Sequence, residues 1–99
     1  MAKKYNCTIL LKGETDVVVD SSKAVLIKGG NVGMTKGGTG DVLAGLVAAL
    51  YCKNEAFLSA AAGSFINKKA GENLSKKMGI YFNSSDLASE IPVIMKDLL

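Results

Sequence analysis

The chain has 99 residues, 48% of them hydrophobic and 21% charged, which is the composition of one globular domain or part of one and not of a disordered chain. The net charge of +3 is mild, histidine is absent and the two cysteines lack CxxC spacing, which argues against a nucleic-acid-binding protein, a zinc site and a histidine base. No apolar run reaches the roughly 18–20 residues of a membrane span, and the start lacks the pattern of a signal peptide. We therefore expect a cytoplasmic protein that binds neither nucleic acid nor membrane.

The first part of the sequence predicts a small sheet. Residues 2–5 are typical of the end of a helix, and residues 7–11 form a short apolar run typical of a buried strand. Two further short strands, at residues 17–19 and Ala24–Ile27, flank a turn, so residues 15–28 predict a β-hairpin. A buried strand needs sheet partners on both sides and cover on both faces, which this hairpin alone does not supply. The pattern is therefore that of the second half of a larger α/β domain.

The second part of the sequence predicts helices. Residues 29–38 show no periodicity and are expected to form a loop, whereas the apolar residues from Thr39 onward have helical spacing and predict a largely buried helix. A second helix is predicted at about residues 54–69. It could continue to Lys77, at a cost of about 1 kcal/mol for the glycine that it would have to include.

A third helix follows the segment NSSD at residues 83–86. Serine is favoured at helix N-termini, so Ser84 or Ser85 is predicted to be the N-cap. Pro92 would lie inside this helix without a backbone N–H to donate, and we expect a kink or a break there. The lysine pair at residues 68–69, on the second helix, is expected to be solvated.

Residues 31–45 read NVGMTKGGTGDVLAG, a glycine-rich loop that leads directly into an apolar stretch. Two well-known phosphate-binding motifs fail here. The P-loop pattern GxxxxGK[ST] fails because Thr39 follows Gly38 where lysine is required, and the dinucleotide pattern GxGxxG fails because residue 43 is leucine. A phosphate site in this loop must therefore rest on the general properties of glycine and of helix N-termini.

Those properties are present. Gly37, Gly38 and Gly40 allow the backbone to aim several N–H groups at one point, and the following helix adds its own unsatisfied N–H groups and roughly half a positive charge. Asp41, in the first turn, would border this anion pocket, where a carboxylate can take a proton from a hydroxyl that attacks a bound phosphate. A glycine loop before a helix and an acid in its first turn also occur without any ligand, so the residues alone leave binding and catalysis open.

Three segments resemble one family in order and spacing: GMTKGGTGDVLAG, the upstream LLKGETDVVV and the final NSSDLASEIPVIMKDLL. They are similar to the NAD(P)H-hydrate dehydratases of the ribokinase-like fold, and together they extend along nearly the whole chain. The resemblance implies an α/β chain that forms the C-terminal portion of a ribokinase-like three-layer α/β/α fold, with residues 1–99 as one incomplete domain.

The resemblance also implies a repair reaction, in which hydrated NADH or NADPH is dehydrated with ADP or ATP as phosphoryl donor. Asp41 corresponds to the acid that contacts the hydrate and acts as base. The anion hole is implied at Gly37, Gly38, Thr39 and Gly40. Nucleotide binding is implied at Lys12, Gly13, Glu14, Thr15, Asp16, Asn31, Gly33, Met34, Lys36 and Gly40. Mg²⁺ is expected to offset phosphate charge, although no metal ligand is evident.

Members of that family are much longer, and their hydrate-binding residues lie mostly upstream. We therefore expect either a fragment of a longer product or a chain that pairs with a separate one. By itself the chain should be inactive or nearly so. We also expect it to form a homo-oligomer. Two other interpretations stay open. One is a ribokinase-like kinase for a hydroxymethylpyrimidine, a thiazole or a sugar, and the other is a non-catalytic module whose sheet edge binds a partner chain.

Overall fold

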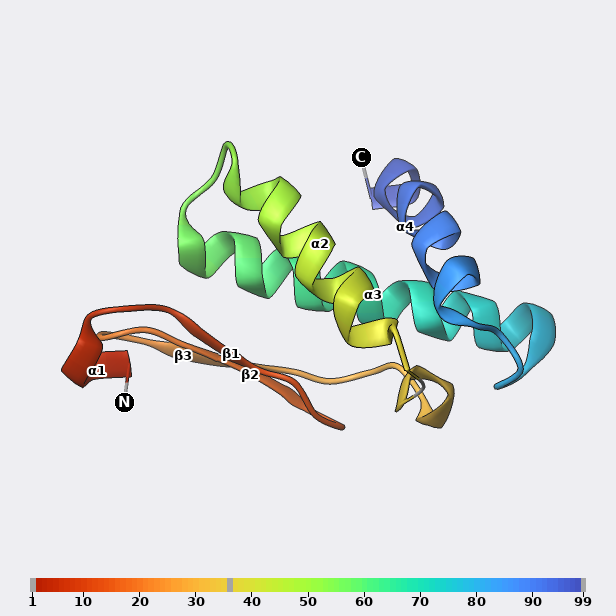
Figure 1. The fold of residues 1–99 in the computed structure, drawn as a ribbon, viewed down its shortest axis with the longest axis horizontal. Coiled ribbons are helices and arrows are strands. Elements are labelled where there is room, and N and C mark those ends of the chain that lie inside the picture. Colours follow the sequence, from red (N-terminus) through yellow and green to blue (C-terminus); the bar gives the residue numbers. More distant parts are fainter. Residues whose placement is uncertain (1, 36, 99) are drawn as a thin grey trace.

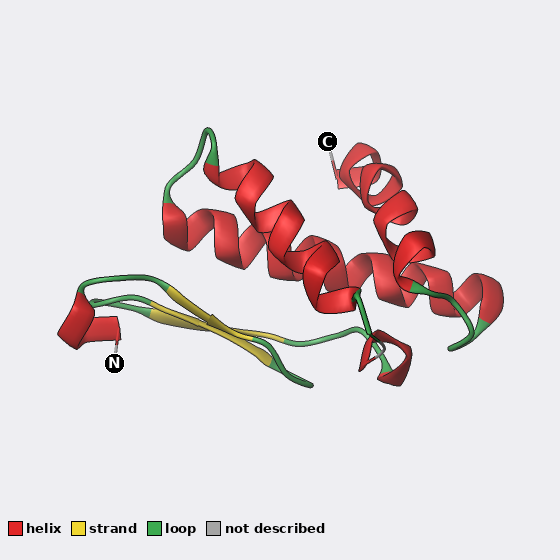
Figure 2. Ribbon diagram, in the orientation of Figure 1, coloured by secondary structure: helices red, strands yellow, loops and turns green. Residues whose placement is uncertain are grey.

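A computed structural model describes residues 2–35 and 37–98 of the chain. In these residues a small sheet lies on one side of a long central helix, and two further helices pack against that helix on its other side (Figures 1 and 2). The elements, in chain order, are α1 Ala2–Tyr5, β1 Ile9–Leu11, β2 Asp16–Val19, β3 Ala24–Ile27, the 3₁₀ turn η1 Val32–Thr35, α2 Thr39–Tyr51, α3 Ala56–Met78 and α4 Ser84–Leu98.

The sheet has the order β1-β2-β3, with both pairs antiparallel. The predicted hairpin is confirmed: Val17 lies opposite Leu26, and Asp20 closes the turn by accepting hydrogen bonds from the backbone N–H groups of Ser22 (2.8 Å) and Lys23 (2.9 Å). The prediction of a buried strand at residues 7–11 is wrong. β1 is an edge strand with β2 as its only neighbour among the described residues, so Leu11 is 64% exposed.

The long helix α3 organises the core. One face carries Ala60 against Val18 and Ile27 of the sheet. The other face carries a larger apolar cluster that α3 shares with η1, α4 and the segment before α4; its members are Met34, Ile66, Ala70, Leu74, Phe82, Leu87, Ile91 and Ile94. A glycine permits the close approach of α2, because a Cβ at Gly63 would lie 2.6 Å from Cγ2 of Val47.

The three long helices begin close to their predicted starts, and α3 does not end near Lys69 but runs on through Gly71 to Met78, the continuation that the sequence left open. The prediction that the helix from Thr39 is largely buried is wrong. In α2 only Thr39 and Leu43 are buried, because this helix contacts α3 and α4 along one side and leaves its other face exposed. Within the described part of the chain, no helix combines the length and the apolar character that a bilayer span requires.

The N-cap of α4 is Asn83 and not one of the two serines. Asn83 Oδ1 accepts from the Asp86 N–H (2.8 Å) while Asp86 Oδ2 accepts from the Asn83 N–H (2.9 Å), a reciprocal capping arrangement. The expected break at Pro92 does not occur, and α4 is assigned as one helix over its whole length. Pro92 has no backbone N–H to donate to the carbonyl of Ala88, four residues earlier. Both residues are exposed, so water can donate to that carbonyl instead.

Candidate nucleotide and phosphate site

A cavity of about 740 Å³ opens between the sheet, η1 and α3. Its walls are the turn at residues 12–16, the segment at residues 28–32, residues 34–35, and the pair at residues 67–68 on α3. This volume lies within the range of about 300–1,000 Å³ that is usual for small-molecule sites. The cavity therefore brings together two loops that are far apart in the sequence.

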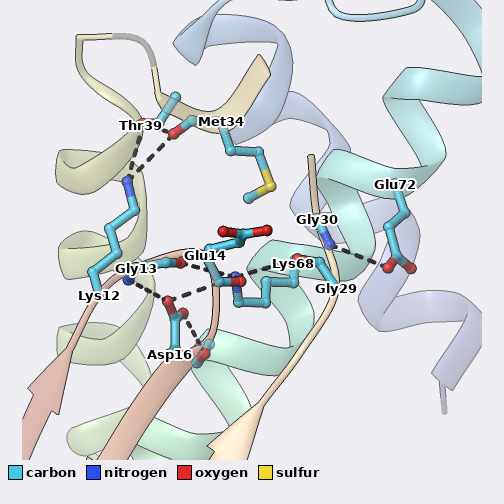
Figure 3. A network of polar contacts seen from close by, with 11 residues as sticks. Lys12, Gly13, Glu14, Asp16, Gly29, Gly30, Met34, Thr39, Lys68 and Glu72 are labelled. Atoms are coloured by element: carbon cyan, nitrogen blue, oxygen red, sulfur yellow. Dashed lines mark hydrogen bonds and ion pairs between the residues drawn. The ribbon is translucent and has the colours of Figure 1, made fainter. Parts of the chain in front are cut away.

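A buried ion pair fixes the first of these loops (Figure 3). Asp16 is 2% exposed, and its carboxylate lies 3.6 Å from Lys68 Nζ while accepting hydrogen bonds from the Gly13 N–H (2.9 Å) and from Ser64 Oγ (2.6 Å). A buried carboxylate is tolerated when it is paired and hydrogen-bonded in this way. These contacts hold the turn at residues 12–16 in place against α3.

Lys68 joins the two loops to each other. Its ammonium group donates to the carbonyl oxygens of Gly13 (3.3 Å), Glu14 (3.2 Å) and Gly29 (3.3 Å), in addition to its pairing with Asp16 (Figure 3). The expectation that Lys68 is solvated is wrong, because its side chain is only 8% exposed. The sequence did contain a signal for this. Ser64, Lys68 and Glu72 recur every four residues, and positions with that spacing lie on one face of a helix.

The second loop is held by the next turn of α3. Glu72 Oε2 accepts from the Gly30 N–H (3.1 Å), and Asn31 Nδ2 donates to the Gly71 carbonyl (2.9 Å). Gly30 has φ +77°, a left-handed conformation in which a side chain would be strained. These contacts fix the backbone of residues 29–31 along one wall of the cavity.

Lys12 connects the first loop to the start of α2. Its ammonium group donates to Thr39 Oγ1 (3.2 Å) and to the Met34 carbonyl (3.4 Å), and Thr39 Oγ1 itself donates to that carbonyl (2.7 Å) (Figure 3). The Lys12 Nζ atom lies 4.0 Å from the position that a Cβ on Gly40 would occupy. A positive charge therefore stands beside the first turn of α2.

The start of α2 has the features of an anion site. Gly38 precedes the helix with φ +90°, a left-handed conformation, and as a glycine it brings no side chain to cap the helix. The N–H groups of the first turn and the helix dipole favour an anion at such a terminus. Asp41 lies in the first turn and is exposed.

The structure gathers part of the predicted nucleotide-binding set around the cavity, namely Lys12, Gly13, Glu14, Thr15, Asp16, Asn31 and Met34. Gly33 is not among the lining residues. It is buried against Phe82, whose Cε2 would lie 2.8 Å from a Cβ at Gly33. Gly37, Gly38, Gly40 and Asp41 form a separate group at the start of α2, and Lys36 lies outside the described residues.

The chain is similar in sequence to proteins of one family. The family profile described as NAD(P)H-hydrate dehydratase matches residues 1–93. The bifunctional NAD(P)H-hydrate repair enzyme Nnr of Methanocaldococcus jannaschii is 52% identical over 89 residues, which is 90% of this chain and 18% of that enzyme. The ADP-dependent (S)-NAD(P)H-hydrate dehydratase of Nitrosopumilus maritimus is 49% identical over 96 residues, 96% of this chain and 33% of that enzyme.

The fold is also that of a solved enzyme. The ADP/ATP-dependent NAD(P)H-hydrate dehydratase of Bacillus subtilis, co-crystallised with ATP/Mg²⁺ and soaked with CoA, superposes with a TM-score of 0.88 at 24% sequence identity, over 99% of this chain and 37% of that one. The expected α/β class, as part of a larger fold, is therefore confirmed. The chain spans about a fifth to a third of the length of these two curated relatives. It belongs to the NAD(P)H-hydrate dehydratase family.

Proposed function

We propose that this chain forms the nucleotide-binding part of an ADP- or ATP-dependent NAD(P)H-hydrate dehydratase and carries its catalytic carboxylate. The observation that carries the proposal is the position of Lys12. This one side chain lines the cavity and also reaches the glycine-preceded start of α2, so it links a space of nucleotide size to an anion site. The family match and the ATP/Mg²⁺ named for the Bacillus subtilis enzyme support the same assignment.

The nucleotide would lie with its phosphates at the start of α2 and its nucleoside in the cavity. The N–H groups near Gly38 and Gly40 and the ammonium group of Lys12 supply hydrogen-bond donors and positive charge for the phosphates. The loops fixed by Lys68 and Glu72 form the walls around the nucleoside. In this arrangement the chain binds the phosphoryl donor mainly through its backbone.

Asp41 would act on the second substrate, hydrated NADH or NADPH. As base, it takes the proton of the hydrate hydroxyl, whose oxygen attacks the terminal phosphorus of ADP or ATP, and the bond to the leaving AMP or ADP breaks. The C–O bond of the resulting phosphate ester then breaks, inorganic phosphate departs, and loss of a proton from the ring restores the dihydronicotinamide. Asp41 is suited to this role because it is exposed beside the anion site.

The described residues contain no group of three or more His, Cys, Asp or Glu side chains that could hold a metal ion. We therefore assign no Mg²⁺ ligand to this chain. The chain also spans only 18% and 33% of its two relatives above, so we infer that the hydrate site is completed by residues outside it, in the same product or in a partner chain. By itself the chain should turn over little or no hydrate. Homo-oligomer formation stays a prediction for size measurement in solution.

The test is a hydrate-repair assay on the complete protein, with ADP and ATP supplied separately. We expect the near-ultraviolet absorbance of the dihydronicotinamide to return together with one phosphate released per turnover. A stable phosphorylated product with no repair would instead indicate the small-molecule kinase, which could use the same anion site. A protein that neither repairs the hydrate nor binds nucleotide would indicate the non-catalytic module.

A further inference from the structure

Lys68 places a positive charge between the two loops that form the cavity. Its ammonium group is surrounded by an oxygen cage, which consists of Asp16 Oδ1 at 3.6 Å and the carbonyl oxygens of Gly13 (3.3 Å), Glu14 (3.2 Å) and Gly29 (3.3 Å) (Figure 3). Three of these oxygens belong to the turn at residues 12–16 and the fourth to the segment at residues 28–32. Two loops that are separate in the sequence therefore converge on one ammonium group.

The oxygen cage needs a cation at its centre. Carbonyl oxygens carry partial negative charge and the carboxylate a full one, so they would repel each other without a positive charge between them. Lys68 and Asp16 have side chains that are only 8% and 3% exposed, and buried charges in proteins are paired or coordinate metal ions. The lysine does for these loops what a bound ion does in sites where backbone carbonyl oxygens replace its hydration shell.

The distances indicate which cations the oxygen cage suits. The carbonyl oxygens stand 3.2–3.3 Å from Nζ, whereas Mg²⁺ and Ca²⁺ hold their oxygen ligands at about 2.0–2.6 Å. A small divalent ion at the centre would leave these carbonyls too far away to bind it. An ammonium group or a large monovalent ion such as K⁺ is closer to the size of this space.

Lys68 lines the cavity, but its charge is committed to the loops. An ammonium group has three N–H donors, and in the described residues three backbone carbonyls accept from it. The second loop also lies on the stem of the side chain, because a Cβ at Gly29 would stand 3.7 Å from Lys68 Cβ and one at Gly30 would stand 3.6 Å from Lys68 Cγ. The side chain is thus arranged to hold backbone and not to reach a ligand phosphate.

We propose that Lys68 is an internal cation, which fills the place of a bound monovalent ion between the two loops and makes nucleotide binding independent of potassium or ammonium ions in solution. Lys68 is a positioning residue, since it acts on the nucleotide through the backbone of the loops. This inference rests on the proposed nucleotide function and adds to it how the walls of the site are held. One consequence is that a space opened by removing the lysine side chain should accept a cation from solution.

The test measures ADP affinity by calorimetry in the complete protein, at equal ionic strength in tetramethylammonium, potassium and ammonium chloride. The wild type should bind ADP within about twofold in all three salts. Lys68→Ala should bind ADP about tenfold or more weakly in tetramethylammonium chloride, whose cation is too bulky for the oxygen cage, and should regain most of that loss in potassium or ammonium chloride. Lys68→Met is the matched control. Its side chain fills the space of the stem without a charge, so its loss should persist in every salt.

Adenosine separates this role from a direct contact to phosphate. If Lys68 holds the loops, Lys68→Ala should weaken the binding of adenosine and of ADP by similar factors, because both ligands use the same cavity walls. A loss confined to ADP would mean that the ammonium group binds phosphate, and the inference would be wrong.

Two other results would overturn the inference. One is a wild-type ADP affinity that depends on potassium or ammonium ions, and the other is a Lys68→Ala protein that neither ion restores, in affinity or in folding. The midpoint of thermal unfolding provides a measurement without nucleotide, since ammonium chloride should raise it more in Lys68→Ala than in the wild type. If the wild type binds no ADP in any salt, the proposed function fails, while this midpoint still shows whether the oxygen cage takes a cation.

Discussion

Asp16 and Lys68 form a buried ion pair that ties the turn before β2 to the middle of α3, with 3.6 Å between Asp16 Oδ1 and Lys68 Nζ. Both side chains are less than a tenth exposed, at 3% and 8%. The pair is completed by hydrogen bonds from Ser64 and from the Gly13 N–H to the carboxylate. Because the same ammonium group also reaches the Gly29 carbonyl, this pair acts on both loops of the cavity, and the contacts of Glu72 and Asn31 add to it on the second loop.

Removing the ammonium group should be costly. In Lys68→Met the Asp16 carboxylate stays buried without its counter-ion, and three backbone carbonyls lose a donor. Breaking one side of a buried ion pair typically costs about 3–5 kcal/mol, so we expect the free energy of unfolding in a urea titration to fall by about that amount. ADP affinity should fall with it, since the first loop loses its counter-ion and both loops lose a hydrogen-bond donor.

The adjacent lysine is the control for this experiment. Lys69 is 51% exposed and lies 3.8 Å from Glu72, an exposed pair of the kind that contributes little. Lys69→Met should therefore change the free energy of unfolding by no more than about 0.5 kcal/mol. Similar losses in both variants would mean that the Asp16–Lys68 pair does not hold the loops.

Much of the fold follows from local patterns. Asp20 and the residues after it form a turn by their own side-chain bonds, and the start of α2 after Gly38 follows from the change from glycine to apolar periodicity. The burial of Lys68 could not be predicted in the same way, since its partner Asp16 is distant in the sequence and only the packed fold brings them together. The exposure of Leu11 was unpredictable for a related reason, because a strand pattern does not say which neighbours a strand has.

The candidate site likewise has features that the sequence predicts and features that only the packed fold determines. The turn at residues 12–16 and the glycine loop were predicted from their residues and from the family resemblance. That Lys12 links them through Thr39 and the Met34 carbonyl depends on tertiary contacts that no motif records. The catalytic role of Asp41 stays a prediction, because its exposure beside the start of α2 is compatible with that role and with a plain helix-dipole partner.

Gly38 should be sensitive to a side chain. Its φ of +90° lies in the left-handed region, and a Cβ would stand 2.8 Å from Ser84 Oγ. Gly38→Ala should lower the free energy of unfolding by about 1–2 kcal/mol and weaken ADP binding at the start of α2. Gly45→Ala, further along α2 and outside the anion site, is the control, because a Cβ there meets nothing within 4 Å. If both substitutions were equally harmless, the backbone geometry assigned to the anion site would be wrong.

Asp20 should make the hairpin sensitive to acid. The hydrogen bond from the Ser22 backbone N–H holds the pKa of this carboxyl below its ordinary value of 3.8. A lowered pKa means that the carboxylate stabilises the folded turn above pH 3.8 and that this contribution disappears as the pH falls through the folded-state value. In Asp20→Asn the midpoint of thermal unfolding should therefore fall less steeply than in the wild type as the pH is lowered through the acid range. If the midpoint of the variant fell as steeply with pH as that of the wild type, other carboxylates would be responsible for the acid sensitivity.

Asp41 provides the sharpest test of the proposed chemistry. Asp41→Asn keeps the size and the exposed position of the side chain while removing its ability to accept a proton. In the complete protein we expect kcat for hydrate repair to fall by about 10²–10⁴-fold, with ADP affinity and the unfolding midpoint little changed, because the base acts only on the hydroxyl. Asp97→Asn, at an exposed position near the end of α4, is the matched control and should leave kcat unchanged. Near-normal turnover by a folded Asp41→Asn protein would remove Asp41 from the mechanism, whereas lost ADP affinity with unchanged kcat would make it a nucleotide contact.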